Sequence, residues 1–266
     1  MSILARSATC GLLMFTPIAT CETLIRAVTA PERQPDDDHA YAALVEKVAP
    51  AMVTVKFVMA YENEDDTTEE EIDGLTIDPS GVVLVSSAMM FGPEYLGVAA
   101  RPREIKIILP GQAESMDAEV IVRDRELDLV WLRIIVAESD KPRTFKHVSF
   151  KSDAKPALGQ EILQVWKLDK FYDRAPYVSS ARVAAMVTKP RELFIASGEV
   201  TIGLPVFDTS GTVLGFGVLQ LPDKEEMDAM TSTNPYSRMI FTRTMLPASR
   251  VATATETALA TQEDED

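Results

Sequence analysis

Few side chains in this chain of 266 residues could carry out covalent chemistry. It has two histidines, His39 and His147, and two cysteines, Cys10 and Cys21. Histidine is the usual base that removes a proton from a serine hydroxyl, and a cysteine thiolate can act as a nucleophile or a zinc ligand. Both cysteines lie near the N-terminus, so the remaining chain has no thiolate nucleophile, cysteine zinc site or disulfide scaffold. We predict no metal and no cofactor, and we expect both histidines to be ordinary surface residues.

Composition and charge narrow the classes of function. Hydrophobic residues make up 46% and charged residues 25% of the chain, as in a soluble globular protein. The net charge of −15 argues against a nucleic-acid partner, because phosphate binding needs clustered lysine and arginine. The acidic residues gather at 36–38, 62–71 and 263–266, which predicts solvated loops and tails. Cation binding by 62–71 stays open, although its spacing matches no calcium loop with defined ligand positions.

The N-terminus has features of an export signal. One arginine precedes an apolar stretch at 8–20, and Val28-Thr29-Ala30 could serve as a small-residue cleavage site. The segment 18–21, Ile-Ala-Thr-Cys, loosely resembles a lipoprotein cleavage motif, which would tether the chain to a membrane. The alternative is a short N-terminal helix of a cytoplasmic protein. We predict a signal peptide or membrane-tethering leader at 1–30, an acidic linker at 31–40, and a periplasmic or extracellular location, with a membrane anchor as an option.

Short strands dominate the rest of the chain. Apolar residues at helical spacing in 39–50 first predict a helix that Pro50 ends. Runs rich in β-branched residues then alternate with turn signals every 8 to 12 residues, which predicts an all-β barrel or sandwich. Asp78-Pro79-Ser80-Gly81 predicts a tight hairpin turn, and a polar connector at 140–147 divides the strands into two units. The strands are expected at 51–61, 74–78, 81–87, 104–110, 117–124, 127–135, 161–168, 180–188, 192–197, 204–208, 212–220 and 237–246.

Six segments, taken in order, resemble trypsin-like serine proteases, most of all the bacterial HtrA (Deg) type. They are YAALVEKVAPAMVTV, IDGLTIDPSG, DRELDLVWLRI, FKSDAKPALGQEILQVWKL, LPVFDTSGTVLGFGV and MLPASRVATATETAL. The resemblance covers 41–260 and implies two packed six-stranded antiparallel β-barrels, at about 50–138 and 148–247, with the active site between them. A closing helix at about 248–260 and an acidic tail at 261–266 would follow. HtrA-type proteases usually continue into a peptide-binding PDZ domain, and we expect none here.

The resemblance also assigns positions to the catalytic residues. Such a protease needs a serine nucleophile, a histidine base, an aspartate that orients the histidine, and two N–H groups that bind the oxyanion. The family carries its histidine after the strand that resembles GVVLVSS, which puts Ala88 at that position. Asp128 matches the family aspartate. The family's Gly-Asn-Ser-Gly-Gly-Pro loop aligns with VTIGLP, so Ile202 stands for the serine and Val200, Thr201 and Gly203 fill the oxyanion loop.

Two of the three triad side chains are therefore missing. Ala88 cannot accept a proton and Ile202 cannot attack a carbonyl. Val200 disfavours the positive φ that glycine offers to an oxyanion loop. A slip of one residue in the alignment would put Thr201 at the nucleophile position, still without a histidine. We expect Asp128 to cap a turn or to accept backbone N–H groups.

The sequence thus favours a trypsin-like pseudoprotease that binds a protein or peptide partner. An active serine-type endopeptidase with a non-standard site and a cation-responsive structural protein are the alternatives. The run 89–91, Met-Met-Phe, could line an apolar cleft or belong to the core. Trp131 and Trp166 lie on expected strands and are expected in the core, and Asp208 and Ser210 are expected to form a turn.

Overall fold

The computed structural model describes residues 35–61, 67–92, 100–137, 143–189, 191–221 and 244–263. Apart from Pro35, they all belong to the second of two compact units, 36–266. The leader at 1–30, both cysteines and most of the acidic tail lie outside the described residues. None of the described helices is long and apolar enough to cross a membrane.

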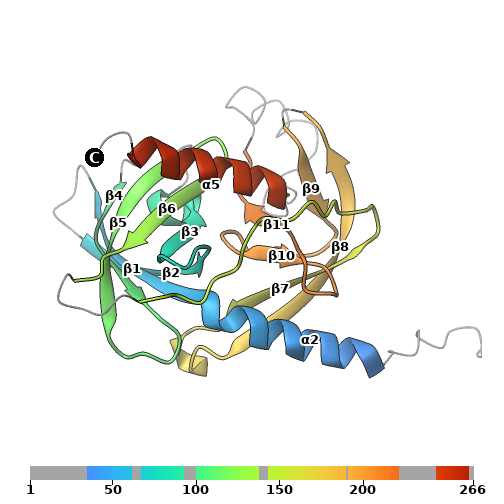
Figure 1. Ribbon diagram of the computed structural model, residues 1–266, viewed down its shortest axis with the longest axis horizontal. Coiled ribbons are helices and arrows are strands. Elements are labelled where there is room, and N and C mark those ends of the chain that lie inside the picture. Colours follow the sequence, from blue (N-terminus) through green and yellow to red (C-terminus); the bar gives the residue numbers. More distant parts are fainter. Residues whose placement is uncertain are drawn as a thin grey trace, which may run out of the picture. The chain divides into compact units, whose positions relative to one another are not determined.

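The first half of the chain forms a closed antiparallel barrel, which can be followed in Figure 1. Its strands run in the order β1-β2-β3-β6-β5-β4. They are β1 (Met52–Tyr61), β2 (Thr67–Thr76), β3 (Val82–Ser86), β4 (Ala100–Ile108), β5 (Ser115–Asp124) and β6 (Leu129–Ile134). Alternate residues of each strand point inward, and the buried set includes Val53, Val55 and Phe57 of β1 and Val130, Leu132 and Ile134 of β6.

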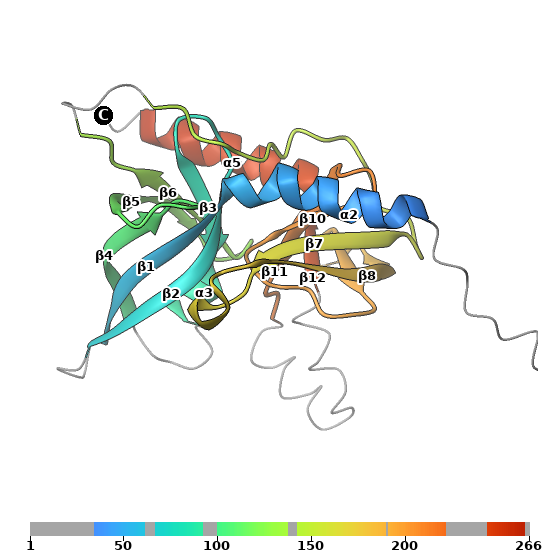
Figure 2. The same ribbon diagram turned by 90° about the horizontal axis from the view of Figure 1, so that it is seen from below.

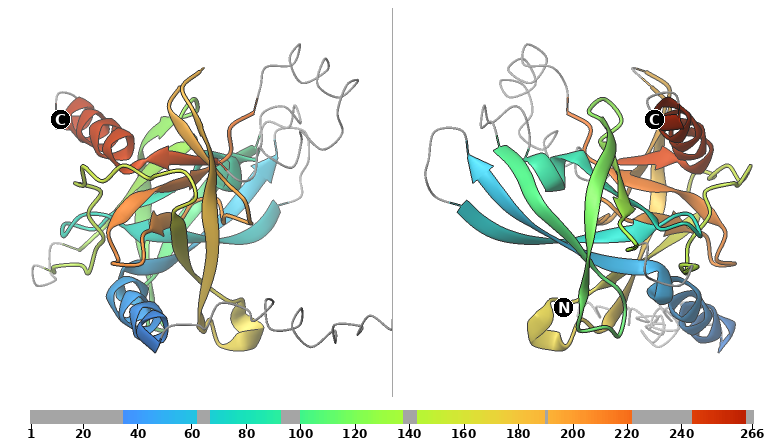
Figure 3. Two further views of the ribbon diagram at one scale, coloured as in Figure 1. Left: turned by 90° about the vertical axis from the view of Figure 1, so that its right-hand side faces the viewer. Right: turned by 60° about the vertical axis from the view of Figure 1, so that its left-hand side comes forward.

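The second half repeats the plan, with strands that are mostly shorter apart from a long β8 (Figure 3). The order in this closed barrel is β10-β11-β12-β9-β8-β7. Its strands are β7 (Glu161–Lys167), β8 (Pro176–Val187), β9 (Leu193–Ala196), β10 (Pro205–Phe207), β11 (Val213–Val218) and β12 (Thr244–Pro247). Its interior holds Ile162, Val183, Phe194, Ala196, Val200, Val206, Leu214 and Met245.

A third apolar cluster joins the two barrels. β6 contributes Leu129 and Trp131 to it, on the opposite face from the residues that fill the first barrel. β11 contributes Phe216 and Val218. A strand buried on both faces needs apolar residues at consecutive positions, which explains why LVWLRI and VLGFGV are continuous apolar runs. These runs therefore mark the strands that lie at the seam between the barrels.

Two helices pack on this seam and lie along one side of the strands in Figure 2. Helix α2 (Pro35–Val48) is followed by a 3-10 turn, η1 (Ala49–Ala51), and α5 (Ala248–Glu263) ends the described chain. α2 buries Leu44 and Val48, and α5 buries Val251 and Ala258. Hydrogen bonds also hold both helices. In α2, the ammonium of Lys47 donates to the carbonyl of Gly211 at 2.7 Å, and Tyr41 donates to Glu161 at 3.0 Å. In α5, Thr255 accepts the indole N–H of Trp131 at 3.0 Å.

The predicted all-β fold of two six-stranded barrels with a helix near each end is confirmed. The Asp78–Gly81 turn is also confirmed, since Ile77 N–H bonds to the Val82 carbonyl at 2.9 Å. Asp208 accepts the N–H of Ser210 at 2.9 Å, as expected of a turn. Of the strand expected at 237–246, residues 244–247 form β12 and the rest lie outside the described residues.

Several boundaries differ from expectation, and three of the differences have a local cause. Residues 67–71 of the acidic run belong to β2, because their backbone pairs with β1 while the charged side chains stay exposed. Residues 87–91 form a short helix, α3 (Ser87–Phe91), because Ser86 caps it by accepting the N–H of Met89. Helix α2 begins at Pro35, inside the segment expected to be a linker, because proline and acidic residues suit the first turn of a helix.

Thr255→Val should lower the free energy of unfolding by about 1 to 2 kcal/mol, because the buried indole N–H of Trp131 loses its acceptor. Urea denaturation followed by tryptophan fluorescence measures this. Thr257→Val is the matched control: Thr257 lies on the same helix and also bonds to the carbonyl four residues earlier, but it is exposed. Equal losses in the two variants would contradict the prediction.

Candidate functional site

Asp128 lies at the turn before β6, where the two barrels meet. Its carboxylate accepts the N–H of Ala88 and the N–H of Leu219, each at 2.7 Å, and the hydroxyl of Ser86 at 2.8 and 3.0 Å. Ala88 and Ser86 belong to the first barrel, whereas Leu219 follows β11 of the second. One buried carboxylate therefore bonds to both barrels. Its acceptance of backbone N–H groups was expected from the sequence, whereas the link between the barrels was not.

The position of Asp128 is energetically costly in two ways. Its backbone lies in the left-handed region, with φ of 61°, which few residues other than glycine adopt. Burial raises the pKa of its carboxyl to about 6, and the bonds from Leu219, Ala88 and Ser86 and the charge of Arg123 only partly oppose that rise. The surrounding hydrogen bonds hold the residue there despite both costs.

Ala88 occupies the place that the family resemblance gives to the catalytic histidine. Its backbone N–H reaches Asp128, but its side chain is a methyl group with no proton to exchange.

The sequence left open whether the two methionines that follow line a cleft or belong to the core, and the structure places one in each environment. Met90 is fully buried in the first barrel, whereas Met89 is 49% exposed and lines the cleft described below. Phe91 packs under the guanidinium of Arg123, 4.0 Å from the ring centre.

The loop at 200–204, which aligns with the nucleophile loop, is fixed by a side chain that the sequence did not single out. Gln164 of β7 is buried, and its amide accepts the N–H of Thr201 at 2.7 Å. The same amide donates to the carbonyls of Thr201 at 2.8 Å and Leu204 at 3.3 Å. The signal in the sequence was a polar residue between the apolar residues 162–163 and 165–166 of one strand, because a buried polar side chain needs hydrogen-bond partners.

The aligned positions in that loop have packing roles. Val200 is buried among the side chains that fill the second barrel. Among the described residues other than glycine, a positive φ occurs at Glu104, Asp128, Asp173 and Arg174, so Val200 does not adopt it. Gly203 does, with φ of 87°, and its N–H bonds to the carbonyl of Gly217 at 2.8 Å. Ile202 is partly exposed and lines the cleft.

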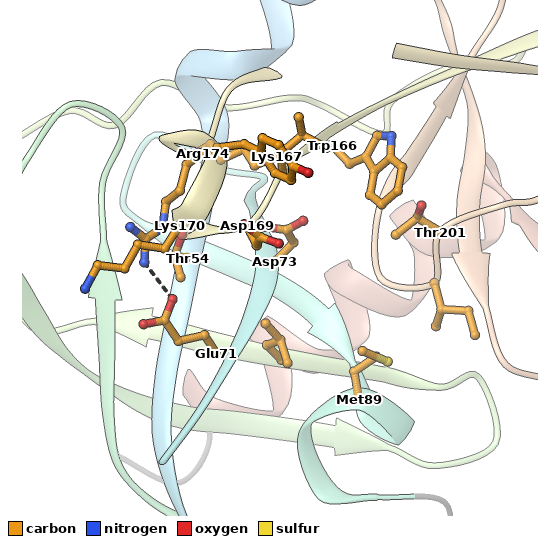
Figure 4. Close-up of a pocket in the computed structure, with 14 residues that line it drawn as sticks. Thr54, Glu71, Asp73, Met89, Trp166, Lys167, Asp169, Lys170, Arg174 and Thr201 are labelled. Atoms are coloured by element: carbon orange, nitrogen blue, oxygen red, sulfur yellow. Dashed lines mark hydrogen bonds and ion pairs between the residues drawn. The ribbon is translucent and has the colours of Figure 1, made fainter. Parts of the chain in front are cut away.

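A cleft of about 520 Å³ adjoins this loop. β2 contributes Glu71 and Asp73, β7 contributes Trp166 and Lys167, and Ile202 completes the wall beside Met89. Figure 4 shows the charged residues at one end of the cleft, with Trp166 and Thr201 toward the other. The structure thus brings Ile202 and Thr201 together with polar residues that the sequence did not connect with the site.

Trp166 corrects one expectation from the sequence. It is only partly buried, lines the cleft, and packs edge-to-face on Tyr177 with ring centres 5.1 Å apart. Its indole N–H is buried without a hydrogen-bond partner among the residues that the structure describes. Trp131, by contrast, is a core residue as expected. The position along β7 accounts for the difference, since Trp166 follows the four buried residues 162–165 and lies at the partly exposed end of the strand.

Glu71 forms ion pairs within its own barrel and across to the second barrel. Glu71 bonds to Lys56 and to Arg174, each at 2.6 Å. Partial burial alone would raise the pKa of Glu71, but these two bonds leave it lowered. Deeper in, the ammonium of Lys167 donates to the carbonyl of Met52 at 2.7 Å.

Lys167 and Asp73 also influence each other. Burial lowers the pKa of Lys167 and raises the pKa of Asp73, while the attraction between the two charges opposes both changes. A cleft wall that carries such perturbed, opposed charges is a candidate for ligand binding.

The other residues considered from the sequence as catalytic or metal-binding are the two histidines and the acidic run. His147 is exposed, as expected, with its ring Nδ1 3.2 Å from the carbonyl of Phe145. His39 lies in α2, and its side chain is outside the described residues. The parts of the chain that the structure describes contain no group of three or more histidine, cysteine or acidic side chains that could hold a metal ion. Residues 62–66 of the acidic run fall outside those parts.

The double barrel defines the trypsin-like fold of serine proteases. One solved structure with this fold is that of the serine endoprotease from Yersinia pestis. It matches with a TM-score of 0.56 at 14% sequence identity, over 83% of this chain and 66% of that one. At this identity the likeness shows the fold alone. No family model and no curated protein sequence matches the chain.

Asp128→Asn should flatten the pH dependence of stability. A carboxyl whose pKa is higher in the folded state stabilises the fold below its ordinary value of 3.8, and this contribution is lost as the pH rises through about 6. The difference corresponds to about 3 kcal/mol. The free energy of unfolding of the unmodified protein, relative to the variant, should therefore fall between pH 4 and 7 in urea titrations.

Asp117→Asn is the control, because Asp117 is an exposed carboxylate on the neighbouring strand β5. It should leave the pH profile parallel to that of the unmodified protein. A constant difference between the unmodified protein and Asp128→Asn from pH 4 to 7 would show that the buried carboxyl does not titrate in this range.

Proposed function

We propose that this protein is a catalytically inactive relative of the trypsin-like serine proteases that binds a protein or peptide partner. One observation carries the proposal: the residue of the first barrel whose backbone N–H lies 2.7 Å from the Asp128 carboxylate, at the place that the resemblance gives to the catalytic histidine, is Ala88. In an acyl-transfer triad the side chain at this point must accept the proton of the nucleophile. A methyl group cannot do so.

The remaining parts of a hydrolytic site are also used for other purposes. The Asp128 carboxylate is occupied by donors from Leu219, Ala88 and Ser86, so it has no histidine to orient. Ser86 donates to this carboxylate but is buried, and a substrate carbonyl cannot reach it. Val200 fills the second barrel instead of leaving room for an oxyanion.

An active hydrolase with a non-standard site would need a base beside an accessible nucleophile. The exposed Ser197 does not fit this role, because its hydroxyl accepts the N–H of Arg182 at 3.2 Å. The cleft between the barrels, in contrast, needs no chemistry to serve as a binding site. These contacts support binding over catalysis.

The unmodified protein should show no labelling by a fluorophosphonate probe and no turnover of unfolded casein, with trypsin as the positive control. Ile202→Ser and Ala88→His, alone or together, should stay unlabelled, because triad members act as a unit and the packed Val200 leaves no oxyanion site. Robust labelling of the unmodified protein, abolished by replacing another serine or threonine, would show that it is an enzyme.

We also propose that the protein works outside the cytoplasm, on the basis of the apolar stretch at 8–20 and the small residues at 28–30. N-terminal sequencing of the protein from its own cells should then give a start beyond about residue 20, or the chain should sediment with membranes. Recovery of the full-length chain from the soluble cytoplasmic fraction would refute this location.

A further inference from the structure

The segment between β7 and β8 is a tightly bonded loop. Its 3-10 turn, η3 (Lys170–Tyr172), is capped by Asp169, whose carboxylate accepts the N–H of Phe171 at 2.8 Å. The Asp169 carbonyl accepts the N–H groups of Tyr172 at 3.1 Å and Arg174 at 3.2 Å. At the base, Leu168 N–H bonds to the carbonyl of Ala175 at 3.0 Å. These bonds give the loop one defined conformation.

The same loop holds two neighbouring residues in an unfavourable conformation. Asp173 and Arg174 have φ of 55° and 50°, in the left-handed region that residues other than glycine seldom adopt. The ion pair between Arg174 and Glu71, at 2.6 Å, ties this part of the loop to the first barrel. Backbone strain that the surroundings maintain is concentrated at functional sites in proteins, so this loop is a candidate interaction site.

The loop presents two aromatic rings to solvent. Phe171 is 87% exposed and Tyr172 is 57% exposed. Their rings contact each other edge-to-face, with centres 5.0 Å apart. Exposed aromatic residues on a preorganised loop are typical of binding hot spots, because little conformational entropy is lost when a partner covers them. The loop also borders the cleft, which Tyr172 helps to line.

The charges around these rings indicate the kind of partner. Asp169 and Asp173 flank the aromatic pair, and the chain as a whole carries a net charge of −15. Arg174 is held by its ion pair with Glu71, which Lys56 shares, so Lys170 is the other cation within the loop 169–174. Aromatic faces beside carboxylates attract lysine and arginine side chains through cation–π and ionic contacts.

We infer that the loop 169–174 is a docking surface for a basic segment of a partner protein. In this arrangement, lysine or arginine side chains of the partner stack on Phe171 and Tyr172 and pair with Asp169 and Asp173. The inference rests on the proposed function, because it names the chemistry of the partner that the non-catalytic module binds. An acidic partner is the competing outcome, and Lys170 would then be its contact.

The test uses the full chain and two fluorescein-labelled nonapeptides, one alternating arginine and alanine and one with glutamate in place of each arginine. Fluorescence anisotropy should give saturable binding of the arginine peptide alone. The double variant Phe171→Ala, Tyr172→Ala should weaken this binding by about tenfold or more. It leaves the net charge unchanged, so a purely long-range attraction by the acidic chain would not be affected. Circular dichroism confirms that each variant is folded.

Two further variants sharpen the result. Lys170→Ala should tighten binding of the arginine peptide, because it removes a repulsive charge, whereas it would weaken binding of an acidic partner. Leu158→Ala is the matched control, because Leu158 is 68% exposed at a turn outside the loop and should have no effect. Absence of saturable binding up to about 1 mM, tighter binding of the glutamate peptide, or an unchanged affinity of the double variant would overturn the inference.

Mass spectrometry of the bound peptide separates the two proposals. An intact arginine peptide that depends on Phe171 and Tyr172 supports both the non-catalytic function and the docking surface. A cleaved peptide would refute the non-catalytic function while the docking surface remained supported by the variants. An intact peptide with the same affinity for every variant would refute the docking surface alone.

Discussion

The architecture of the site depends on one buried carboxylate. Asp128 accepts hydrogen bonds from Ala88 at the start of α3 and from Leu219 at the end of β11, so a single side chain fixes the ends of elements from both barrels. In a triad such a carboxylate orients a histidine. Here the carboxylate bonds to backbone N–H groups and a serine hydroxyl, and these bonds partly offset the cost of burying its charge. The role of Asp128 in this structure is to hold the two barrels together.

The loop at 200–204 is fixed by packing and by side-chain hydrogen bonds. A working oxyanion loop must hold backbone N–H groups free and keep space for a substrate, which commonly reduces stability. In this protein Val200 and Leu204 are buried in apolar clusters, and Gln164 bonds to the backbone of Thr201 and Leu204. The two ends of the loop are therefore part of the core, whereas Ile202 between them lines the cleft. What remains open is the adjoining cleft, whose walls are charged and aromatic.

Much of the fold could be predicted from the sequence, because strand alternation, the Asp78–Gly81 turn and the apolar runs of the seam are local signals. The closeness of Ala88 to Asp128 agrees with the order of the motifs. Contacts between distant segments could not be predicted: the pair Arg174–Glu71 joins residues 103 positions apart. Trp166 was assigned to the core because it lies on an expected strand, and the sequence does not identify which end of that strand borders a cleft.

The long-range contacts of the helices also constrain how the chain can fold. Trp131 meets Thr255 across 124 positions, and Lys47 of α2 meets Gly211 across 164. The seam between the barrels is complete only once α5 has been synthesised, because α5 supplies Val251 and Ala258 to it. Contacts of such sequence separation form slowly. Until then the growing chain exposes part of the apolar surface that the helix covers in the folded protein.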